Sequence, residues 1–221
     1  MDQPGYGLIE TIRVRDGRIP LLQRHLARLA RSLAELRLPK PSQDVALLVR
    51  PFAGTGDAVL RVEVRDGRAS VTVRELPPLD PPAVITASEP HHPYPHKTTE
   101  RDCFADAGKE ADVAEADDAL LLTAEGWVAE GTVWTVFWWE GDVLRTPALD
   151  LGILPGIGRA RVLELVQRAE QGRYRPQGLG GKSVFLANAV RGIVPMASLD
   201  GALVPADPRT PELASRFWPP A

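Results

Sequence analysis

The chain has 221 residues, of which 26 are lysine or arginine and 29 are aspartate or glutamate, and its formal net charge is −3. This balance gives no support for nucleic acid or a membrane as a partner, and no apolar run reaches membrane-spanning length. A single cysteine excludes an internal disulfide framework and the N-terminus lacks signal-peptide features, so we expect a soluble cytoplasmic protein.

The first third of the chain predicts a helix packed on antiparallel strands. Residues 7–15 are typical of a strand that ends in an Asp-Gly turn, and leucines spaced by three and four over 22–36 predict an amphipathic helix. We expect Ser42 to cap a second, short helix. Residues 59–64 and 70–73 alternate on either side of another Asp-Gly turn, which is the clearest hairpin in the chain.

Prolines become dense before the middle of the chain and indicate a domain boundary. A strand is expected over 84–86, and the prolines over 88–95 predict a loop. We therefore expect an α+β domain over residues 1–88, a linker over 89–97 and a larger second domain over 98–221.

The second half of the chain alternates short strands with two helices. One helix is expected over 99–114 and the other from Arg159 onward. The expected strands, recognised by apolar, aromatic and β-branched runs, cover 119–122, 127–130, 132–139, 143–146, 184–186, 193–194 and 203–204.

Lys97 stands between the proline-rich linker and the next predicted helix. A lysine whose pKa is lowered by burial or by a neighbouring positive charge can attack a carbonyl and hold a Schiff base. Taken alone, a lysine is far more often a solvated surface amine. The other lysines of the second half, Lys109 on an exposed helix face and Lys182 in a loop, are poorer candidates.

Three other features have a functional interpretation beside an ordinary one. Glu130 ends a short strand, where a buried carboxylate needs a positive partner, although most such residues are turn glutamates. The glycine-rich loop 152–158 leads into a helix and suits an anion, although many β-to-α turns look the same. Arg28 shares a helix face with His25 and can fork onto a phosphate, or simply be solvated.

No metal site is expected from the histidines of the linker. His91, His92 and His96 have no cysteine or carboxylate at ligand spacing beside them, so an ordinary linker explains them.

Taken in order, these segments resemble the class IV aminotransferases, which are fold-type IV enzymes that use pyridoxal 5′-phosphate. The family includes branched-chain aminotransferases, D-amino-acid aminotransferases and 4-amino-4-deoxychorismate lyases. The opening Tyr-Gly-Leu-Ile-Glu-Thr, the His-Lys-Thr-Thr sequence and the Asn188-Ala189 pair are most similar to the lyase branch. The resembling segments, spread over most of the chain, are Gly7–Thr11, His25–Leu29, His96–Arg101, Ala119–Gly126, Glu130–Thr132, Thr146-Pro147, Gly152–Arg159 and Asn188–Gly192.

The resemblance implies a fold and a set of roles. The family fold is a small N-terminal α/β sandwich domain followed by a larger pseudo-barrel domain, with the site between them and usually completed in a homodimer. Lys97 matches the lysine that holds the cofactor, Glu130 the carboxylate that pairs with the pyridine nitrogen, and Arg28 the arginine that contacts the phosphate. Further cofactor-binding positions are matched by Ile157, Gly158, Asn188 and Ala189.

The resemblance also implies a reaction and leaves alternatives open. The lyase would convert 4-amino-4-deoxychorismate to 4-aminobenzoate and pyruvate, and association with a synthase component is compatible with it. A class IV aminotransferase acting on branched-chain or D-amino acids shares the same lysine, glutamate and phosphate loop. A binding module on the same fold without catalysis is the remaining reading. Arg101 and Arg191 are candidates for contacts with the substrate carboxylates.

Three positions depart from the commoner family pattern. Gly158 stands where many members carry threonine, so a hydroxyl contact worth about 1 kcal/mol to phosphate binding is lost. Thr135 stands where asparagine is usual, and Phe104 where many members carry a tyrosine that can hydrogen-bond the cofactor.

Overall fold

The structure is a computed structural model that describes residues 5–54 and 56–220. By their internal contacts these residues form two units, and each is described by itself. The smaller unit contains the described residues up to Pro78 together with His96–Glu100 and residues 219–220, and the larger contains Leu79–Pro95 and Arg101–Trp218. The domain limits expected at residues 88 and 98 stay a prediction, whereas the contacts divide the linker between the units.

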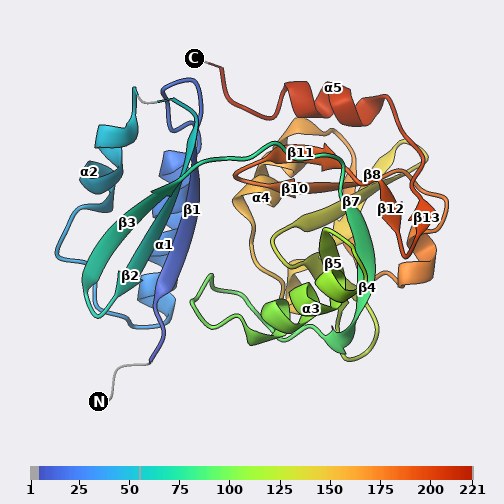
Figure 1. Ribbon diagram of the computed structural model, residues 1–221, viewed down its shortest axis with the longest axis horizontal. Coiled ribbons are helices and arrows are strands. Elements are labelled where there is room, and N and C mark those ends of the chain that lie inside the picture. Colours follow the sequence, from blue (N-terminus) through green and yellow to red (C-terminus); the bar gives the residue numbers. More distant parts are fainter. Residues whose placement is uncertain (1–4, 55, 221) are drawn as a thin grey trace. The chain divides into compact units, whose positions relative to one another are not determined.

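The smaller unit is a three-stranded antiparallel sheet with helices on one face (Figure 1). Alternate residues of the first strand, such as Leu8 and Ile12, point to one face and pack against Leu29 and Leu33 of the long helix. Its elements are β1 (Leu8–Val14), α1 (Leu22–Glu35), α2 (Val45–Val49), the 3₁₀ turn Arg50–Phe52, β2 (Ala58–Arg65) and β3 (Arg68–Arg74).

The Asp-Gly turns of this unit are found where the sequence predicted them, but the residue that caps α2 differs from the prediction. Asp66 and Gly67 both have positive φ, 51° and 70°, which the twist of a two-residue hairpin requires. The expectation that Ser42 caps the second helix is wrong. Helix α2 begins at Val45, so the cap position falls on Asp44, whose Oδ1 accepts a hydrogen bond of 2.8 Å from the Ala46 N–H.

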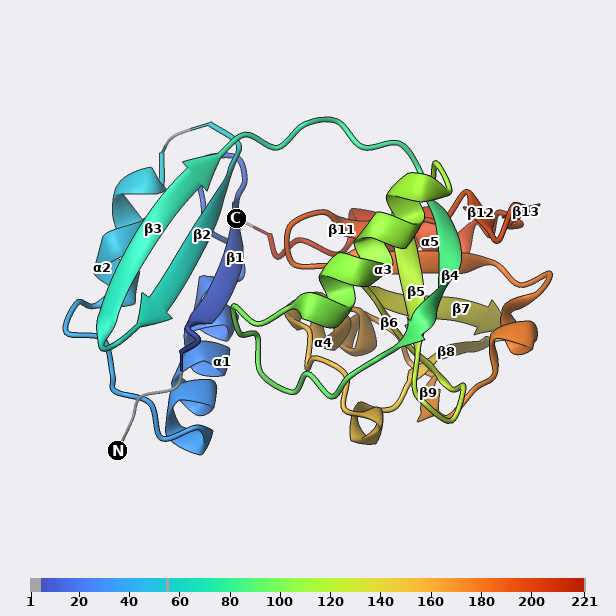
Figure 2. The same cartoon turned by 60° about the horizontal axis from the view of Figure 1, so that its bottom comes forward.

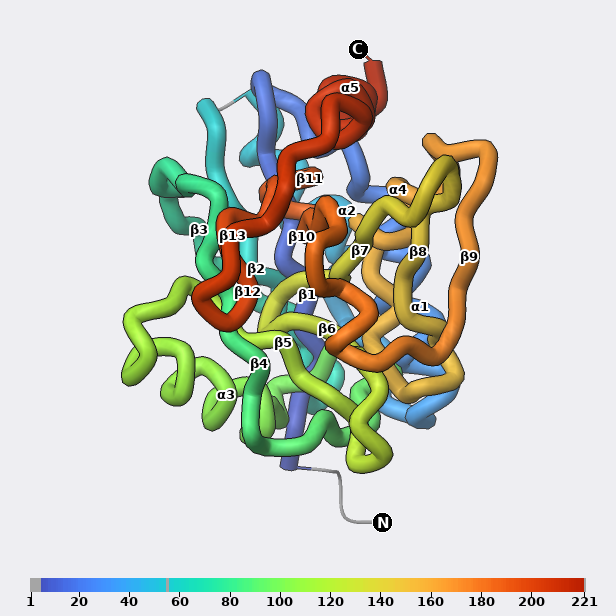
Figure 3. The backbone as a smooth tube through the Cα atoms, turned by 90° about the vertical axis from the view of Figure 1, so that its right-hand side faces the viewer, coloured from blue at the N-terminus to red at the C-terminus, as the bar shows by residue number. Residues whose placement is uncertain are grey.

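The larger unit contains two five-stranded sheets. The first has the order β13-β12-β4-β5-β6 and the second the order β11-β10-β7-β8-β9, in which β8 and β9 run side by side (Figure 3). The strands of the first sheet are β4 (Ala83–Pro90), β5 (Asp118–Leu122), β6 (Val128–Gly131), β12 (Ser198–Leu199) and β13 (Ala202–Leu203). Those of the second are β7 (Thr135–Glu140), β8 (Val143–Pro147), β9 (Ala169–Gly172), β10 (Val184–Asn188) and β11 (Gly192–Pro195).

The two sheets face each other across an apolar core. Leu120 of β5 packs there with Trp138 of β7 and Leu186 of β10. Its neighbours Ala119 and Leu121 belong to a second apolar cluster with residues of α3, the helix that crosses β4 and β5 in Figure 2. The expected α+β class is therefore confirmed. The described residues contain no helix that is long and apolar enough to cross a membrane. The remaining elements are α3 (Asp102–Val113), α4 (Ile157–Leu165), α5 (Arg209–Ser215) and the 3₁₀ turns Leu149–Leu151 and Pro176–Leu179.

Several expected boundaries were wrong for reasons that lie in tertiary pairing. Strand β4 continues to Pro90, in what was expected to be a loop, because Pro90 pairs with Leu122 of β5 after a shift in register. Helix α3 starts at Asp102 instead of Thr99, because the Thr99 N–H donates to the Gly7 carbonyl (2.9 Å). The strand expected from Thr132 starts at Thr135, since the residues before it form a loop.

Candidate active site

Lys97 lies on a short extended segment that pairs with β1. The Ile9 N–H donates to the Lys97 carbonyl (2.7 Å), and on the other side of Thr98 the Gly7 N–H donates to Thr99 Oγ1 (2.9 Å). These bonds fix the backbone on both sides of the lysine, whose side chain is partly buried. The amine therefore projects from a defined position at the edge of a sheet, as a catalytic lysine needs.

Arg28 is held by a buried carboxylate that the sequence analysis did not consider. Its Nε donates to Glu10 Oε1 (2.8 Å) and its Nη2 donates to Glu10 Oε2 (2.6 Å), which is a bidentate pair. His25 Nδ1 lies 2.7 Å from the same Oε2. Burial raises the pKa of Glu10, but the Arg28 charge and the hydrogen bonds from His25 and Arg28 outweigh it and lower that pKa to about 2.

The electrostatics of this cluster extend to Lys97. Burial lowers the pKa of His25, against the pull of Glu10, so the imidazole is neutral and its Nδ1–H donates to the carboxylate. The charges of Arg28 and Lys97 lower the same pKa further, so Lys97 is within electrostatic reach of the cluster. Glu10 takes the Nε–H and one N–H of Nη2, so the guanidinium of Arg28 can still offer an anion the N–H groups of Nη1, for which the described chain shows no hydrogen-bond partner, and the second N–H of Nη2.

Glu130 is a buried residue of β6 whose two oxygens differ. Oε1 accepts hydrogen bonds from His91 Nε2 and from the Leu154 N–H, both at 3.0 Å, whereas no described residue donates to Oε2. Arg159 lies within electrostatic reach: burial lowers the pKa of its guanidinium to about 10, and the Glu130 charge opposes that shift. One carboxylate oxygen is thus anchored and the other can accept from a ligand.

The glycine-rich loop forms the start of α4, two residues earlier than expected. Gly156 is the N-cap residue and no side chain caps the helix, so its first N–H groups can bind an anion. A Cβ at Gly158 would lie 2.6 Å from the backbone of Asn188, and one at Gly156 would lie 3.1 Å from Thr135 Oγ1. Glycine is needed here because the end of β10 lies against this turn.

The side chain of Asn188 shapes the turn between β10 and β11. Its Oδ1 accepts from the N–H groups of Val190 (2.9 Å) and Arg191 (2.8 Å), and its Nδ2 donates to the Val133 carbonyl (3.3 Å). The groups of Asn188 and Ala189 that suit a ligand are therefore those of the main chain. The same bonds tie this turn to the loop after Glu130.

Asp118 binds the loop that follows Glu130 through Thr132. It is buried at the start of β5, and its Oδ1 accepts from Thr132 Oγ1 and from the Thr132 N–H (3.3 Å). Burial raises the pKa of Asp118 to about 6, although these hydrogen bonds and the Arg101 charge oppose the shift. Its Oδ2 is buried without a partner.

The structure shows what surrounds three residues that the sequence analysis singled out. Two of them, Gly158 and Phe104, depart from the commoner family pattern, and the third, Arg101, was a candidate for a substrate contact. A threonine at position 158 has no room, because its Cβ would meet the Asn188 backbone. Phe104 is buried in an aromatic cluster, edge-on to Tyr94 (4.9 Å) and to His91 (5.9 Å). Arg101, a candidate for a substrate carboxylate, lies over Phe104 and donates from Nη2 to the Thr132 carbonyl (2.5 Å), which is a local structural role.

The predicted site residues therefore fall into two groups. In the smaller unit Arg28 pairs with Glu10 beside His25, and the charge of Lys97 lies within electrostatic reach of His25. The larger unit brings together Glu130, Ile157, Gly158, Asn188 and Ala189 through Leu154, Arg159 and the turn contacts. Sequence reasoning missed three buried residues of these groups, Glu10, His91 and Asp118. Of these, Glu10 carried a signal, since it lies on the apolar face of β1 between Leu8 and Ile12.

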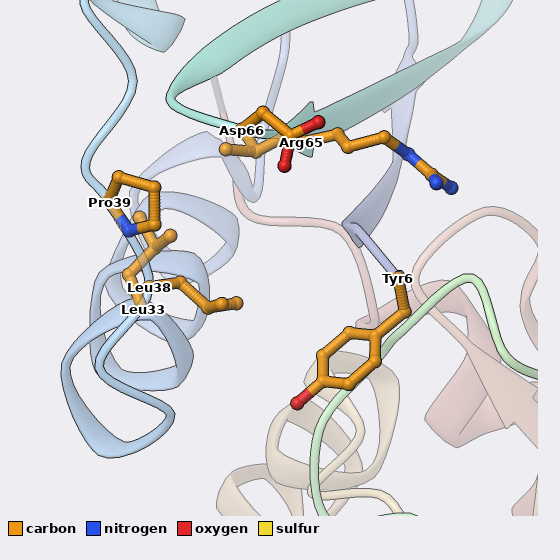
Figure 4. A pocket seen from close by; sticks show the side chains of 7 residues that line it. Tyr6, Leu33, Leu38, Pro39, Arg65 and Asp66 are labelled. Carbon is orange, nitrogen blue, oxygen red and sulfur yellow. The ribbon is translucent and has the colours of Figure 1, made fainter. Parts of the chain in front are cut away.

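Other hollows and clusters in the described chain are poorer sites. A depression lined by Tyr6, Leu33 and Arg65 among others has a volume of about 10 Å³, which is room for about one water molecule (Figure 4). A groove of about 440 Å³ contains Arg168 and Arg209, but these pair with Asp142 and Asp207. The described residues contain no group of three or more His, Cys, Asp or Glu side chains placed to hold a metal.

Comparisons with known proteins agree with the resemblance. The sequence profile of the family described as amino-transferase class IV matches residues 7–199. The aminodeoxychorismate lyase of Bacillus subtilis is 33% identical over 88 residues, which are 38% of this chain and 30% of that protein. A putative branched-chain-amino-acid aminotransferase of Methanocaldococcus jannaschii is 28% identical over 90% of this chain and 81% of its own length. The crystal structure of a putative amino-acid aminotransferase from Mesorhizobium loti has a TM-score of 0.80 and 31% identity, covering 87% of this chain and 99% of that one.

Proposed function

Because the chain belongs to the class IV aminotransferase family, whose enzymes use pyridoxal 5′-phosphate, we propose that it converts 4-amino-4-deoxychorismate to 4-aminobenzoate and pyruvate. The observation that carries the proposal is the His-Lys-Thr-Thr segment, in which Lys97 is fixed by β1 beside the Arg28 cluster. The 33% identity to a protein named aminodeoxychorismate lyase favours the lyase reaction, although that match spans under a third of the relative.

The residues present fit the cofactor. Lys97 supplies the amine that binds it, and Glu130 Oε2 is an acceptor suited to a protonated pyridine nitrogen. The uncapped N–H groups of Ile157 and Gly158 and the free Nη1 of Arg28 suit the phosphate. Within the larger unit, the turn at Asn188 lies so close to the start of α4 that position 158 has no room for a side chain.

In the proposed reaction the cofactor accepts electrons from the substrate, and residues of the chain orient the cofactor and move the proton. When bound, pyridoxal phosphate supplies an electron-accepting ring that stabilises negative charge on the amine-bearing carbon of the substrate. Glu130 favours the protonated ring nitrogen by its negative charge. As a free amine, Lys97 would take the proton from that carbon at Nζ. The bond from the substrate's ring to the enolpyruvyl oxygen would then break with its electron pair on that oxygen, and the proton would return to the enol carbon, so that the group leaves as pyruvate.

Amino transfer is the second candidate function. It shares the proton abstraction by Lys97 and differs in where this lysine returns the proton. The 28% identity to a protein named as a branched-chain-amino-acid aminotransferase, over 90% of this chain, favours it. Membership of an enzyme family favours catalysis over the non-catalytic binding module.

The proposal also includes a homodimer, a cytoplasmic location and association with a synthase component. The homodimer and the association rest on the family resemblance, and the location rests on the single cysteine of the sequence. Light scattering of the purified protein tests the dimer, and co-purification with a synthase component tests the association.

An assay of product formation separates the two reactions. The holoenzyme is given 4-amino-4-deoxychorismate, and pyruvate and 4-aminobenzoate are measured; parallel samples receive branched-chain or D-amino acids with 2-oxoglutarate. Equal amounts of both products, lost in Lys97→Ala and kept in Lys182→Ala, support the lyase. Amino transfer without pyruvate release would replace it with the second candidate.

A further inference from the structure

We propose that His91 is a positioning residue for Glu130, holding one carboxylate oxygen so that the other remains the acceptor for the pyridine nitrogen. The inference rests on the assignment of Glu130 within the proposed function. It does not depend on whether the reaction is lyase or aminotransferase, because both need the same pairing.

The imidazole is rigidly placed. His91 lies at the end of β4, and its backbone N–H donates to the Leu122 carbonyl of β5 (2.6 Å). Its ring is buried and packs edge-on to Phe104 (5.9 Å). A donor fixed by both its backbone and its ring contact can hold a partner in one orientation.

The bond to Glu130 restricts the carboxylate. The terminal torsion of a glutamate is broad, so a single anchor leaves its two oxygens free to exchange places. Here His91 Nε2 and the Leu154 N–H converge on the same oxygen, Oε1, at 3.0 Å each. With both donors present Oε2 keeps its place, and without His91 only the Leu154 N–H remains.

The second ring nitrogen of His91 lies in an unfavourable environment, which indicates that the residue has a role beyond packing. While Nε2 of His91 is bound to Glu130, the other ring nitrogen, Nδ1, is buried with no hydrogen-bond partner in the described chain. A buried polar atom without a partner is destabilising, and such atoms in native structures call for an explanation. The hydrogen bond from His91 to Glu130 explains why an imidazole is kept at this position. Arg159 also lies within electrostatic reach of Glu130, but its Nη2 donates to the Pro147 carbonyl (2.9 Å) and to Gln171 (2.7 Å).

The test is a double-mutant cycle on cofactor affinity. The full chain is freed of cofactor and titrated with pyridoxal phosphate, and binding is followed by the visible absorption band. The variants are His91→Leu, Glu130→Gln and the two combined. We expect His91→Leu to weaken binding about tenfold in the wild-type background, as for loss of one charge-assisted hydrogen bond, and less than about twofold beside Glu130→Gln.

Two further variants separate positioning from packing. His91→Gln keeps an N–H donor at a similar distance and is expected to restore most of the affinity, whereas His91→Asn is too short to reach Oε1 and is expected to behave as His91→Leu. His92→Gln, at an exposed neighbouring position, is the matched control and is expected to bind as the wild type does. The pH at which the visible band changes is expected to shift in the same direction in His91→Leu and Glu130→Gln.

Three results would overturn the proposal: wild-type affinity in His91→Leu, an equal loss in both backgrounds, or failure of His91→Gln to restore binding. If His91→Leu does not fold, the comparison of His91→Gln with His91→Asn decides in the same way. Failure of the proposed reaction can be told apart from failure of this inference. In that case the cofactor titrations of all variants give the expected result, but the holoenzyme releases no pyruvate from 4-amino-4-deoxychorismate.

Discussion

Replacing Asp118 with asparagine is expected to change how stability depends on pH. Burial raises the pKa of this carboxyl to about 6 in the folded chain, against an ordinary value of 3.8. The charged form of Asp118 is therefore less favourable in the folded chain than in the unfolded one. Above pH 6 this lowers the free energy of unfolding by its full amount, and the effect disappears as the pH falls toward 3.8. At 1.36 kcal/mol per pH unit, the difference corresponds to about 3 kcal/mol.

The asparagine variant lacks this titration. Its Oδ1 can still accept from Thr132, so the loop after Glu130 is retained. Urea unfolding of both proteins is measured from pH 4 to pH 8. The free energy of unfolding of the variant minus that of the wild type is expected to rise by about 2.4 kcal/mol across this range, because about 0.6 kcal/mol of the cost is already present at pH 4.

A matched substitution controls for the general effect of removing a negative charge. Asp112 is exposed on α3, and Asp112→Asn is measured in parallel as the control, so that the effect of removing a surface charge can be subtracted. A flat difference for Asp118→Asn, or one that falls as the pH rises, would refute the assignment of a raised pKa to the buried carboxyl.

Two further substitutions test the two halves of the candidate site. Glu10→Gln removes a carboxylate whose pKa is lowered from 4.5 to about 2, so its contribution of about 3 kcal/mol is present above pH 4.5 and lost toward pH 2. Urea unfolding is expected to show a loss of at least that size at pH 7, because Arg28 is left buried and unpaired, and a smaller loss at pH 3; equal losses at both would contradict this. Gly158→Ala places a Cβ 2.6 Å from the Asn188 backbone and is expected to cost about 1–3 kcal/mol and to weaken cofactor binding. Gly178→Ala, with open space around its Cβ, is the control, and equal stability of the two variants would show that the turn can shift.

Much of the fold could be predicted because local pattern and tertiary structure agree. The leucine spacing of α1 and the Asp-Gly turn between β2 and β3 are local signals that packing preserves. Strand β9, Ala169–Gly172, was not predicted because its residues alternate in no apolar pattern. It exists through parallel pairing with β8, which a single sequence does not reveal.

Family motifs led to the candidate site residues but not to their neighbours. Lys97 and Glu130 were proposed from matched segments, whereas the residues that contact them are set by long-range contacts. His91 stood in a proline-rich stretch with no periodicity, and it meets Glu130 because β4 extends to Pro90 beside β5. Likewise, glycine at position 158 looked like a lost contact until the approach of Asn188 explained it.

The central claim is that Lys97 binds the cofactor, and chemical trapping tests it most directly. The holoenzyme is reduced with borohydride, digested, and the modified peptide is mapped by mass spectrometry. We expect a single cofactor label on Lys97, also present in Lys182→Ala and absent in Lys97→Ala. A label on Lys109 or Lys182, or spread over many lysines, would contradict the account.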